Sequence, residues 1–298
     1  MSLIDHEFGG ISTELKLSML NAYLKAFTTA LSRKNYELWY IDAFAGTGER
    51  TVKFESSTAT LFEEETDERI ERFRGSAKLA IDVEPKFDRL FFIEKKQKFV
   101  LALNQLARDN SERKIEILHG DSNSEIRKLV SENDWRKKRA VLFLDPYGMN
   151  VEWSTLEAIR ATEAIDVWYL VSLAGLYRQA TRAEEALTTD KQSALTRMLG
   201  TDTWRVEWYK ETQRDLFDDI KKQRVANVDE IRQYVKIRLD TLFPKVLEPA
   251  TLKHDTKNFP NFALFFAISN PNSNAINLAT RIADHILSSG KASQVRPR

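Results

Sequence analysis

Acidic residues and glycines follow four short apolar runs of the chain, and these residue types can bind polar ligands. Gly46 and Gly48 follow the first run, Glu94 closes the second, Asp121 follows the third, and Asp145-Pro146-Tyr147-Gly148 follows the fourth. We expect the four runs to be parallel strands of one sheet, in which ligands bind at the carboxyl ends of the strands. The pattern therefore predicts a single site assembled from four loops.

The chemistry of these groups matches the polar parts of one cofactor. A strand-end acid such as Glu94 can accept hydrogen bonds from both hydroxyls of a ribose, and Asp121 can accept one from the amine of adenine. A turn built on Gly46 and Gly48 can accommodate an amino-acid carboxylate. These are the groups of S-adenosyl-L-methionine. The third glycine of a dinucleotide-binding turn and the GxxxxGK[ST] phosphate loop are missing, which disfavours dinucleotide binding and nucleotide hydrolysis.

The ordered motifs resemble those of the class I, Rossmann-like methyltransferases over about residues 36–175. Asp42-x-Phe44-x-Gly46-x-Gly48 is similar to their first motif and the Asp145–Gly148 turn to their fourth, catalytic motif. The cofactor residues that the resemblance implies are Asp42, Phe44, Gly46, Gly48, Glu94, Asp121 and Ser122. We expect no metal site, because the chain has no cysteine and its four histidines are scattered.

A second resemblance, which covers most of the chain, is to the three-Cys-motif partner protein family. It rests on Leu15-Lys16-Leu17, Tyr23-Leu24, Tyr40–Gly46, Gly75-Ser76, Phe92-Ile93-Glu94, Leu144–Gly148 and Phe265–Pro271. This resemblance implies a prokaryotic methyltransferase-like protein and a partner with radical-SAM-like cysteines. It implies no particular substrate.

The fourth motif is the best sequence clue to the methyl acceptor. Methyltransferases that act on base amines carry an Asp/Asn-Pro-Pro-aromatic turn there, and Asp145 and Tyr147 are similar to its acid and its aromatic residue, although the second proline is absent. The resemblance implies that Asp145 orients an amine and that Tyr147 stacks on the base, so the expected acceptor is a nitrogen of a DNA or RNA base. Alternatively, the turn only shapes a strand exit and Tyr147 packs against the cofactor.

Composition limits the possible functions further. Lys and Arg number 45 and Asp and Glu 44, so bulk positive charge cannot hold the chain on nucleic acid. The longest apolar run, Phe262–Ile268, is far shorter than the ~20 residues of a spanning helix. The start of the sequence has no secretory pattern. We expect a cytoplasmic protein without a membrane segment.

The pattern of elements predicts an α/β fold with a mostly parallel sheet and helices on both faces. Expected strands are 38–44, 89–94, 115–119, 140–145 and 166–171, with a late antiparallel pair at 245–254 and 261–269. Expected helices are 13–33, 76–83, 95–110, 123–132, 152–162, 178–199, 203–222, 228–242 and 274–288. We expect residues 1–298 to form a single methyltransferase-like domain.

Four segments lie outside that basic pattern. We expect residues 1–35 to be an N-terminal helical segment, residues 177–243 a helical insertion and residues 290–298 a flexible tail. Residues 49–74 form an insertion over the cofactor turn, either a surface loop or a lid that closes over the ligand. A non-enzymatic alternative is a methyltransferase-like subunit that binds its partner through 177–243 and uses the cofactor as a structural ligand or not at all.

Overall fold

A central sheet of eight strands organises the protein in the computed structural model, which describes residues 11–55, 68–212, 221–253 and 260–295. Five strands are parallel: β1 (Glu37–Asp42), β4 (Arg89–Glu94), β5 (Ile115–His119), β6 (Lys138–Leu144) and β7 (Ile165–Ser172). They lie in the order β7-β6-β1-β4-β5. The carboxyl ends of β1, β4, β5 and β6 therefore meet at one edge, as the sequence predicts.

The late strands extend the sheet beyond β7. β12 (Pro260–Ile268) runs antiparallel to β7, and both β10 (Lys245–Val246) and β11 (Ala250–Lys253) pair antiparallel with β12. The predicted late antiparallel pairing is confirmed, but the expected strand 245–254 is two short strands. His254 lies outside the described residues.

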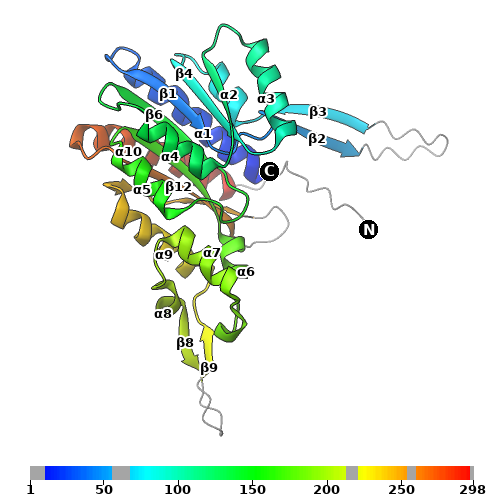
Figure 1. Ribbon diagram of the computed structural model, residues 1–298, viewed down its shortest axis with the longest axis vertical. Helices are drawn as coiled ribbons and strands as arrows, with labels where there is room; N and C mark the ends of the chain where they lie inside the picture. Colours follow the sequence, from blue (N-terminus) through cyan, green and yellow to red (C-terminus); the bar gives the residue numbers. More distant parts are fainter. Residues whose placement is uncertain (1–10, 56–67, 213–220, 254–259, 296–298) are drawn as a thin grey trace, which may run out of the picture.

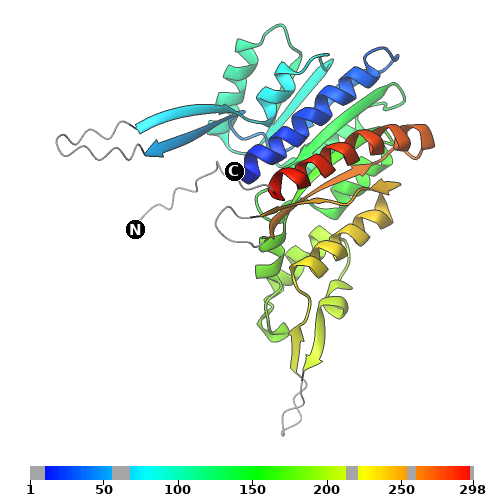
Figure 2. The same cartoon turned by 180° about the vertical axis from the view of Figure 1, so that it is seen from behind.

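Helices cover both faces of the sheet because side chains alternate along each strand. Leu38 and Tyr40 pack against α1 (Ile11–Leu31), α2 (Ser76–Asp82), α3 (Gln97–Asp109) and α10 (Ser273–Val295). Trp39 and Ile41 belong to the opposite core, formed with α4 (Ser122–Ser131), α5 (Trp153–Ala161), α6 (Leu173–Gln179), α7 (Thr189–Leu199) and α9 (Val228–Leu242). Figure 2 shows α1 and α10 side by side on their face.

The predicted helical insertion is the region where the sequence analysis was least accurate. The expected helix 178–199 is divided into α6, a short 3-10 helix (Glu184–Ala186) and α7, because the Thr188 side chain caps a new helix start by accepting from the Lys191 N–H. The expected helix 203–222 ends after one turn, α8 (Trp204–Trp208). The chain continues as a hairpin of β8 (Tyr209–Thr212) and β9 (Lys221–Arg224).

Trp204 and Trp208 explain that error. Their spacing of four suggests one face of a long helix, but both rings are fully buried against the core, 5.7 Å apart, with Tyr209 beside Trp204. The backbone carbonyl of Trp208 then accepts from Val225 N–H at 2.8 Å, which anchors the chain after β9 beside α8. Tertiary packing thus overrides the helical periodicity.

The other two atypical segments also differ from expectation. Residues 49–74 contain an antiparallel hairpin of β2 (Glu49–Glu55) and β3 (Glu68–Arg74), which projects from the body in Figure 1. Residues 56–67 of this insertion lie outside the described residues, and the choice between a surface loop and a lid stays a prediction. α10 continues through Gly290 to Val295, beyond the expected helix end at residue 288, and the flexibility of the tail 290–298 stays a prediction. Within the described residues, no helix combines the length and apolar character needed to cross a membrane.

Candidate functional site: a cavity at the carboxyl edge

The glycine turn after β1 depends on two residues in the left-handed backbone region. Gly46 has φ +59° and Gly48 has φ +75°, which side chains rarely tolerate. A Cβ on Gly48 would also lie 2.7 Å from Leu106 of α3, whereas no described atom lies within 4 Å of one on Gly46. Gly48 therefore allows close packing, and Gly46 presents bare backbone to open space.

Glu94 ties this turn to the end of β4. Its side chain is buried, with 8% of the residue exposed. Oε2 accepts from the Gly46 N–H at 3.0 Å, and Oε1 accepts from the Lys96 N–H at 2.8 Å. Each carboxylate oxygen can accept another hydrogen bond. Glu94 thus orders the turn and keeps acceptor capacity for a ligand.

Asp121 caps the helix that follows β5. Its Oδ1 accepts from Asn123 N–H at 3.1 Å and Ser124 N–H at 3.3 Å, while the residue itself is exposed. Ser122 Oγ donates to the carbonyl of Ala43, so α4 begins against the end of β1. These caps fix the third loop beside the glycine turn.

A cavity of about 420 Å³ lies where these loops meet. Five of the predicted site residues line it: Phe44, Glu94, Asp121, Ser122 and Tyr147. Asp42, Gly46, Gly48 and Asp145 are not among its lining residues. Lining residues that the sequence analysis did not predict as site residues include Asn123, Asn150, Glu152 and Arg197, together with Lys95 and Lys96. The cavity thus combines acidic, amide and basic side chains with the exposed ring of Tyr147.

Asp42 lies buried beneath the glycine turn. Its carboxylate accepts from Phe44 N–H and Tyr40 OH, both at 3.3 Å. Burial raises the pKa of Asp42 to about 6, and the charge of Asp145 acts in the same direction. Any influence of Asp42 on a ligand would therefore pass through the turn it supports.

Asp145 is paired with a residue from the other end of the sequence. Lys16 Nζ on α1 lies 2.5 Å from Asp145 Oδ2, with side-chain exposures of 13% and 28%. The sequence analysis did not assign Lys16 to the site. A lysine between Leu15 and Leu17 on the apolar helix was the available signal, since a lysine that is largely buried needs a partner.

Tyr147 is the exposed member of the fourth loop, at 57%. Lys96 Nζ lies 5.2 Å from the centre of its ring. Partial burial raises the pKa of Tyr147, and the charges of Glu94 and Asp145 raise it further, so the phenol stays neutral near pH 7. The fourth loop therefore presents a neutral aromatic ring with an ammonium group beside it.

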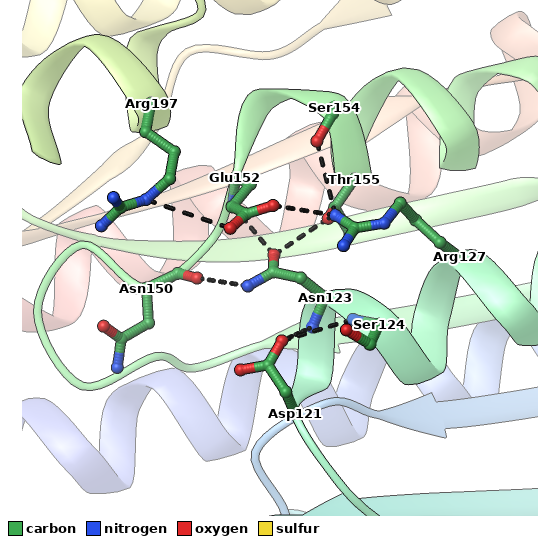
Figure 3. A network of polar contacts seen from close by, with 9 residues as sticks. All are labelled: Asp121, Asn123, Ser124, Arg127, Asn150, Glu152, Ser154, Thr155 and Arg197. Atoms are coloured by element: carbon green, nitrogen blue, oxygen red, sulfur yellow. Dashed lines mark hydrogen bonds and ion pairs between the residues drawn. The ribbon is translucent and has the colours of Figure 1, made fainter. Parts of the chain in front are cut away.

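Asn123 connects the third loop to the fourth, as Figure 3 shows. Its Nδ2 donates to the Asn150 carbonyl at 2.8 Å, and its Oδ1 accepts from Glu152 N–H and Thr155 Oγ1, both at 2.9 Å. Arg127 Nη1 adds an ion pair to Glu152 at 2.9 Å. One buried amide thereby holds the segment that follows the Asp145 turn against α4.

Comparisons with known proteins support the fold. No protein-family model matches the sequence, and no curated protein matches it. The structure of protein LPL1258 from Legionella pneumophila, described by the family model DUF519, aligns with a TM-score of 0.53 at 13% identity, over 95% of this chain and 94% of that one. This likeness concerns the fold alone.

Two further structures align less well. An S-adenosylmethionine-dependent methyltransferase from Clostridium acetobutylicum has a TM-score of 0.38 at 10% identity, over 85% of this chain and 92% of that one. TYW2 of M. jannaschii, solved in complex with AdoMet, has a TM-score of 0.35 at 9% identity, over 89% and 80%. The strand order described above confirms the predicted α/β fold with a mostly parallel sheet and a late antiparallel pairing, and the likeness to LPL1258 extends over nearly the whole chain. The three-Cys-motif partner resemblance stays a prediction.

Proposed function

We propose that the protein is a SAM-dependent methyltransferase, and the observation that carries this proposal is the position of Glu94. This buried acid accepts one hydrogen bond from Gly46 N–H in the glycine turn and one from Lys96 N–H after β4, and it lines the carboxyl-edge cavity together with Asp121. When bound, S-adenosyl-L-methionine supplies a methyl group on a positively charged sulfur. Glu94 would hold the ribose hydroxyls, Asp121 the adenine amine, and the bare backbone at Gly46 the amino-acid end.

The chain's own groups fit this cofactor in two respects. The open space at Gly46 permits close approach to the backbone, and the carboxylates of Glu94 and Asp121 keep acceptor capacity beyond their backbone partners. Among the described residues no cluster of three or more His, Cys, Asp or Glu could hold a metal ion. The chain would then act by positioning two reactants and by electrostatic complementarity.

Calorimetric titration with S-adenosylhomocysteine tests cofactor binding directly. We expect one site per chain and a severalfold lower affinity in Glu94→Gln, because an amide offers one acceptor oxygen where two are needed. Glu157→Gln is the matched control, since Glu157 is exposed on α5 away from the cavity. No saturable binding by the folded wild-type chain would refute the proposed function.

For the acceptor, we propose a nitrogen of a nucleic-acid base. Asp145 would accept a hydrogen bond from the amine, and the paired Lys16 would keep that carboxylate oriented. Tyr147 would stack on the base while Lys96, beside its ring, meets a phosphate. This assignment rests on the residue types of the fourth loop and on their exposure.

Transfer of a tritium-labelled methyl group decides between acceptors. Separate reactions should contain DNA, RNA and protein fractions, and the labelled product should be digested to nucleosides or amino acids. We expect label in an N-methylated nucleoside. Label confined to amino acids would refute the nucleic-acid assignment while leaving the methyltransferase assignment intact.

A second candidate is a subunit that binds a three-cysteine-motif protein. Val206 on α8 and Val225 after β9 are both exposed by more than half, and both belong to the segment predicted as the docking surface. We expect a purified protein of that type to bind the chain, and Val206→Lys to weaken binding. If transfer occurs at full rate without the partner, the partner is not needed for catalysis.

A further inference from the structure

A second cavity lies at the opposite edge of the sheet from the candidate active site. Its volume is about 490 Å³, within the range of small-molecule sites. Asp166 at the start of β7 and Arg139 at the start of β6 line it, so it lies at the amino ends of these strands. α1 and α10, the neighbouring helices in Figure 2, contribute the side walls.

Asp166 is an unusual residue for its position. On β7 it has the same orientation as Trp168 and Leu170, which belong to the apolar core beneath α1 and α10. A carboxylate in such a row is costly unless its hydrogen bonds are satisfied. Tyr23 OH donates to Oδ2 at 2.6 Å, and among the described residues no donor is found for Oδ1. The floor of the cavity therefore presents an acceptor.

The mouth of the cavity has the opposite charge. Lys34 is exposed, and the Arg139 guanidinium lies over the Tyr36 ring, 4.1 Å from its centre. Arg139 donates to two backbone carbonyls, and among the described residues no carboxylate lies within ion-pair distance of either cation. Burial raises the pKa of Asp166, and the charge of Arg139 acts on that carboxyl in the opposite direction and lowers its pKa. The lining thus has two cations against one carboxylate. This excess of positive charge favours an anionic group in the ligand.

Apolar side chains also line the cavity. They come from α1 and α10: Phe27, Leu31, Leu278, Ala279 and Ile282. The start of α10 is not available to an anion, because Asn272 Oδ1 already accepts from Asn274 N–H and Ala275 N–H. The three requirements on a ligand are thus a donor for Asp166, an apolar or aromatic body for the walls, and an anionic group for Arg139 and Lys34.

Common ligand classes can be compared with these requirements. A fatty acid would place hydrocarbon against the Asp166 carboxylate, and a sugar phosphate would leave the apolar walls unused. A nucleotide with an exocyclic amine meets all three requirements. We propose that this amino-edge cavity binds an adenine-type nucleotide, with the base amine on Asp166 and the phosphate at Arg139 and Lys34. The inference does not depend on the proposed methyltransferase activity.

The same chemistry could come from a free mononucleotide or from a nucleotide in a nucleic-acid strand. Calorimetric titrations of the full chain should compare adenosine monophosphate, inosine monophosphate and a 5′-phosphorylated tetra-adenylate. We expect the inosine compound to bind at least tenfold more weakly, because it replaces the amine donor with a carbonyl. Binding of the mononucleotide identifies a free ligand, and binding of the tetra-adenylate alone identifies a strand.

Variants locate the binding. Asp166→Asn should reduce adenosine monophosphate affinity at least tenfold, and Ala275→Trp should block the cavity from the start of α10. The matched control is Asn277→Trp, at an exposed position of α10 outside the cavity lining. Circular dichroism and thermal denaturation confirm folding of each variant.

The outcomes are clear-cut because the two cavities have separate residues. Loss of nucleotide binding in Ala275→Trp with retention in Glu94→Gln supports the proposal. Retention in both Asp166→Asn and Ala275→Trp overturns it, as does the absence of saturable binding by every probe. Loss in Glu94→Gln alone would also overturn it, because the nucleotide would then occupy the carboxyl-edge cavity.

Discussion

Two carboxylates at the ends of β4 and β6 are held in contrasting ways. Glu94 is fixed by the backbone N–H groups of Gly46 and Lys96, the second only two residues away. Asp145 is fixed by the side chain of Lys16, 129 residues away on α1. The first arrangement follows from turns that any similar chain would form, whereas the second requires a correctly docked N-terminal helix. Cofactor affinity should therefore depend less than the methyl-transfer rate on the correct docking of the N-terminal helix.

The largest expected effect tests the acceptor side. Asp145→Ala should reduce methyl transfer roughly 100-fold or more, as expected when an acid–base or orienting group is lost. Affinity for S-adenosylhomocysteine should change by less than about tenfold, because Asp145 does not line the cavity. Single-turnover transfer and calorimetry measure the two quantities, with Asp134→Asn, an exposed acid, as the control. Full activity would show that the turn only shapes the strand exit.

The next prediction concerns the cofactor side. Glu94→Ala should weaken S-adenosylhomocysteine binding by about 1–3 kcal/mol, or roughly 5- to 150-fold, because it removes the acceptor for two backbone N–H groups and for the ligand. Saturating cofactor should restore much of the transfer rate. Calorimetry and transfer at several cofactor concentrations measure this. If the transfer rate stays low at saturating cofactor, Glu94 also supports the reaction with the acceptor. The contrast between Glu94 and Asp145 would then be weaker.

The third prediction concerns the pH dependence of folding stability, which the raised pKa of Asp42 affects. Its pKa of about 6 lies above the ordinary value of 3.8, so the folded chain binds this proton more tightly than the unfolded chain. Ionisation of Asp42 therefore lowers the stability of the fold. This loss grows as the pH rises from about 4 to 6 and is complete above about 6. Asp42→Asn should raise stability by roughly 1–3 kcal/mol at pH 8 and by little at pH 4. Thermal denaturation across this range checks it; an equal change at both values contradicts the assignment.

Lys16→Met should have a smaller effect on transfer. We expect a decrease of about tenfold with unchanged S-adenosylhomocysteine affinity, since the pair is partly exposed and such pairs are worth little more than about 1 kcal/mol. Lys25→Met, on an exposed position of the same helix, should leave both quantities unchanged. An equal loss of methyl transfer and of cofactor affinity would show that Lys16 supports the cofactor loops as well as Asp145.

The smallest effect is expected for the amide that joins the two sides. Asn123→Ala removes the hydrogen bonds to the Asn150 carbonyl, Glu152 N–H and Thr155 Oγ1, so both cofactor affinity and transfer should fall about three- to tenfold. Asn123→Asp keeps the acceptor and should lie between Ala and wild type. Ser124→Ala, on the exposed side of α4, is the control. A change in cofactor affinity alone, or in methyl transfer alone, would show that Asn123 supports only that one function.

The sequence predicted what depends on local pattern. The strands 89–94 and 115–119 and the helix 228–242 match the structure residue for residue, because each is a single periodic run between clear end signals. Glu94 and Asp121 were predicted together because strand order places their loops at one edge, and both line the cavity there. Lys16, Asn123 and Arg197 were missed because their roles depend on distant partners. The spacing of Trp204 and Trp208 led to the wrong prediction of a helix over 203–222, because helical spacing does not reveal where a helix ends.

The antiparallel strand β12 has a consequence for synthesis and folding. It pairs with β7 on one side and supplies the described pairing of β10 and β11, yet it comes after all of them in the chain. Until residues 260–268 leave the ribosome, the edge of β7 stays open and the two short strands have no partner among the described residues. An unpaired edge invites association with other chains. A translating chain would thus be most vulnerable to aggregation just before its final strand and helix are made.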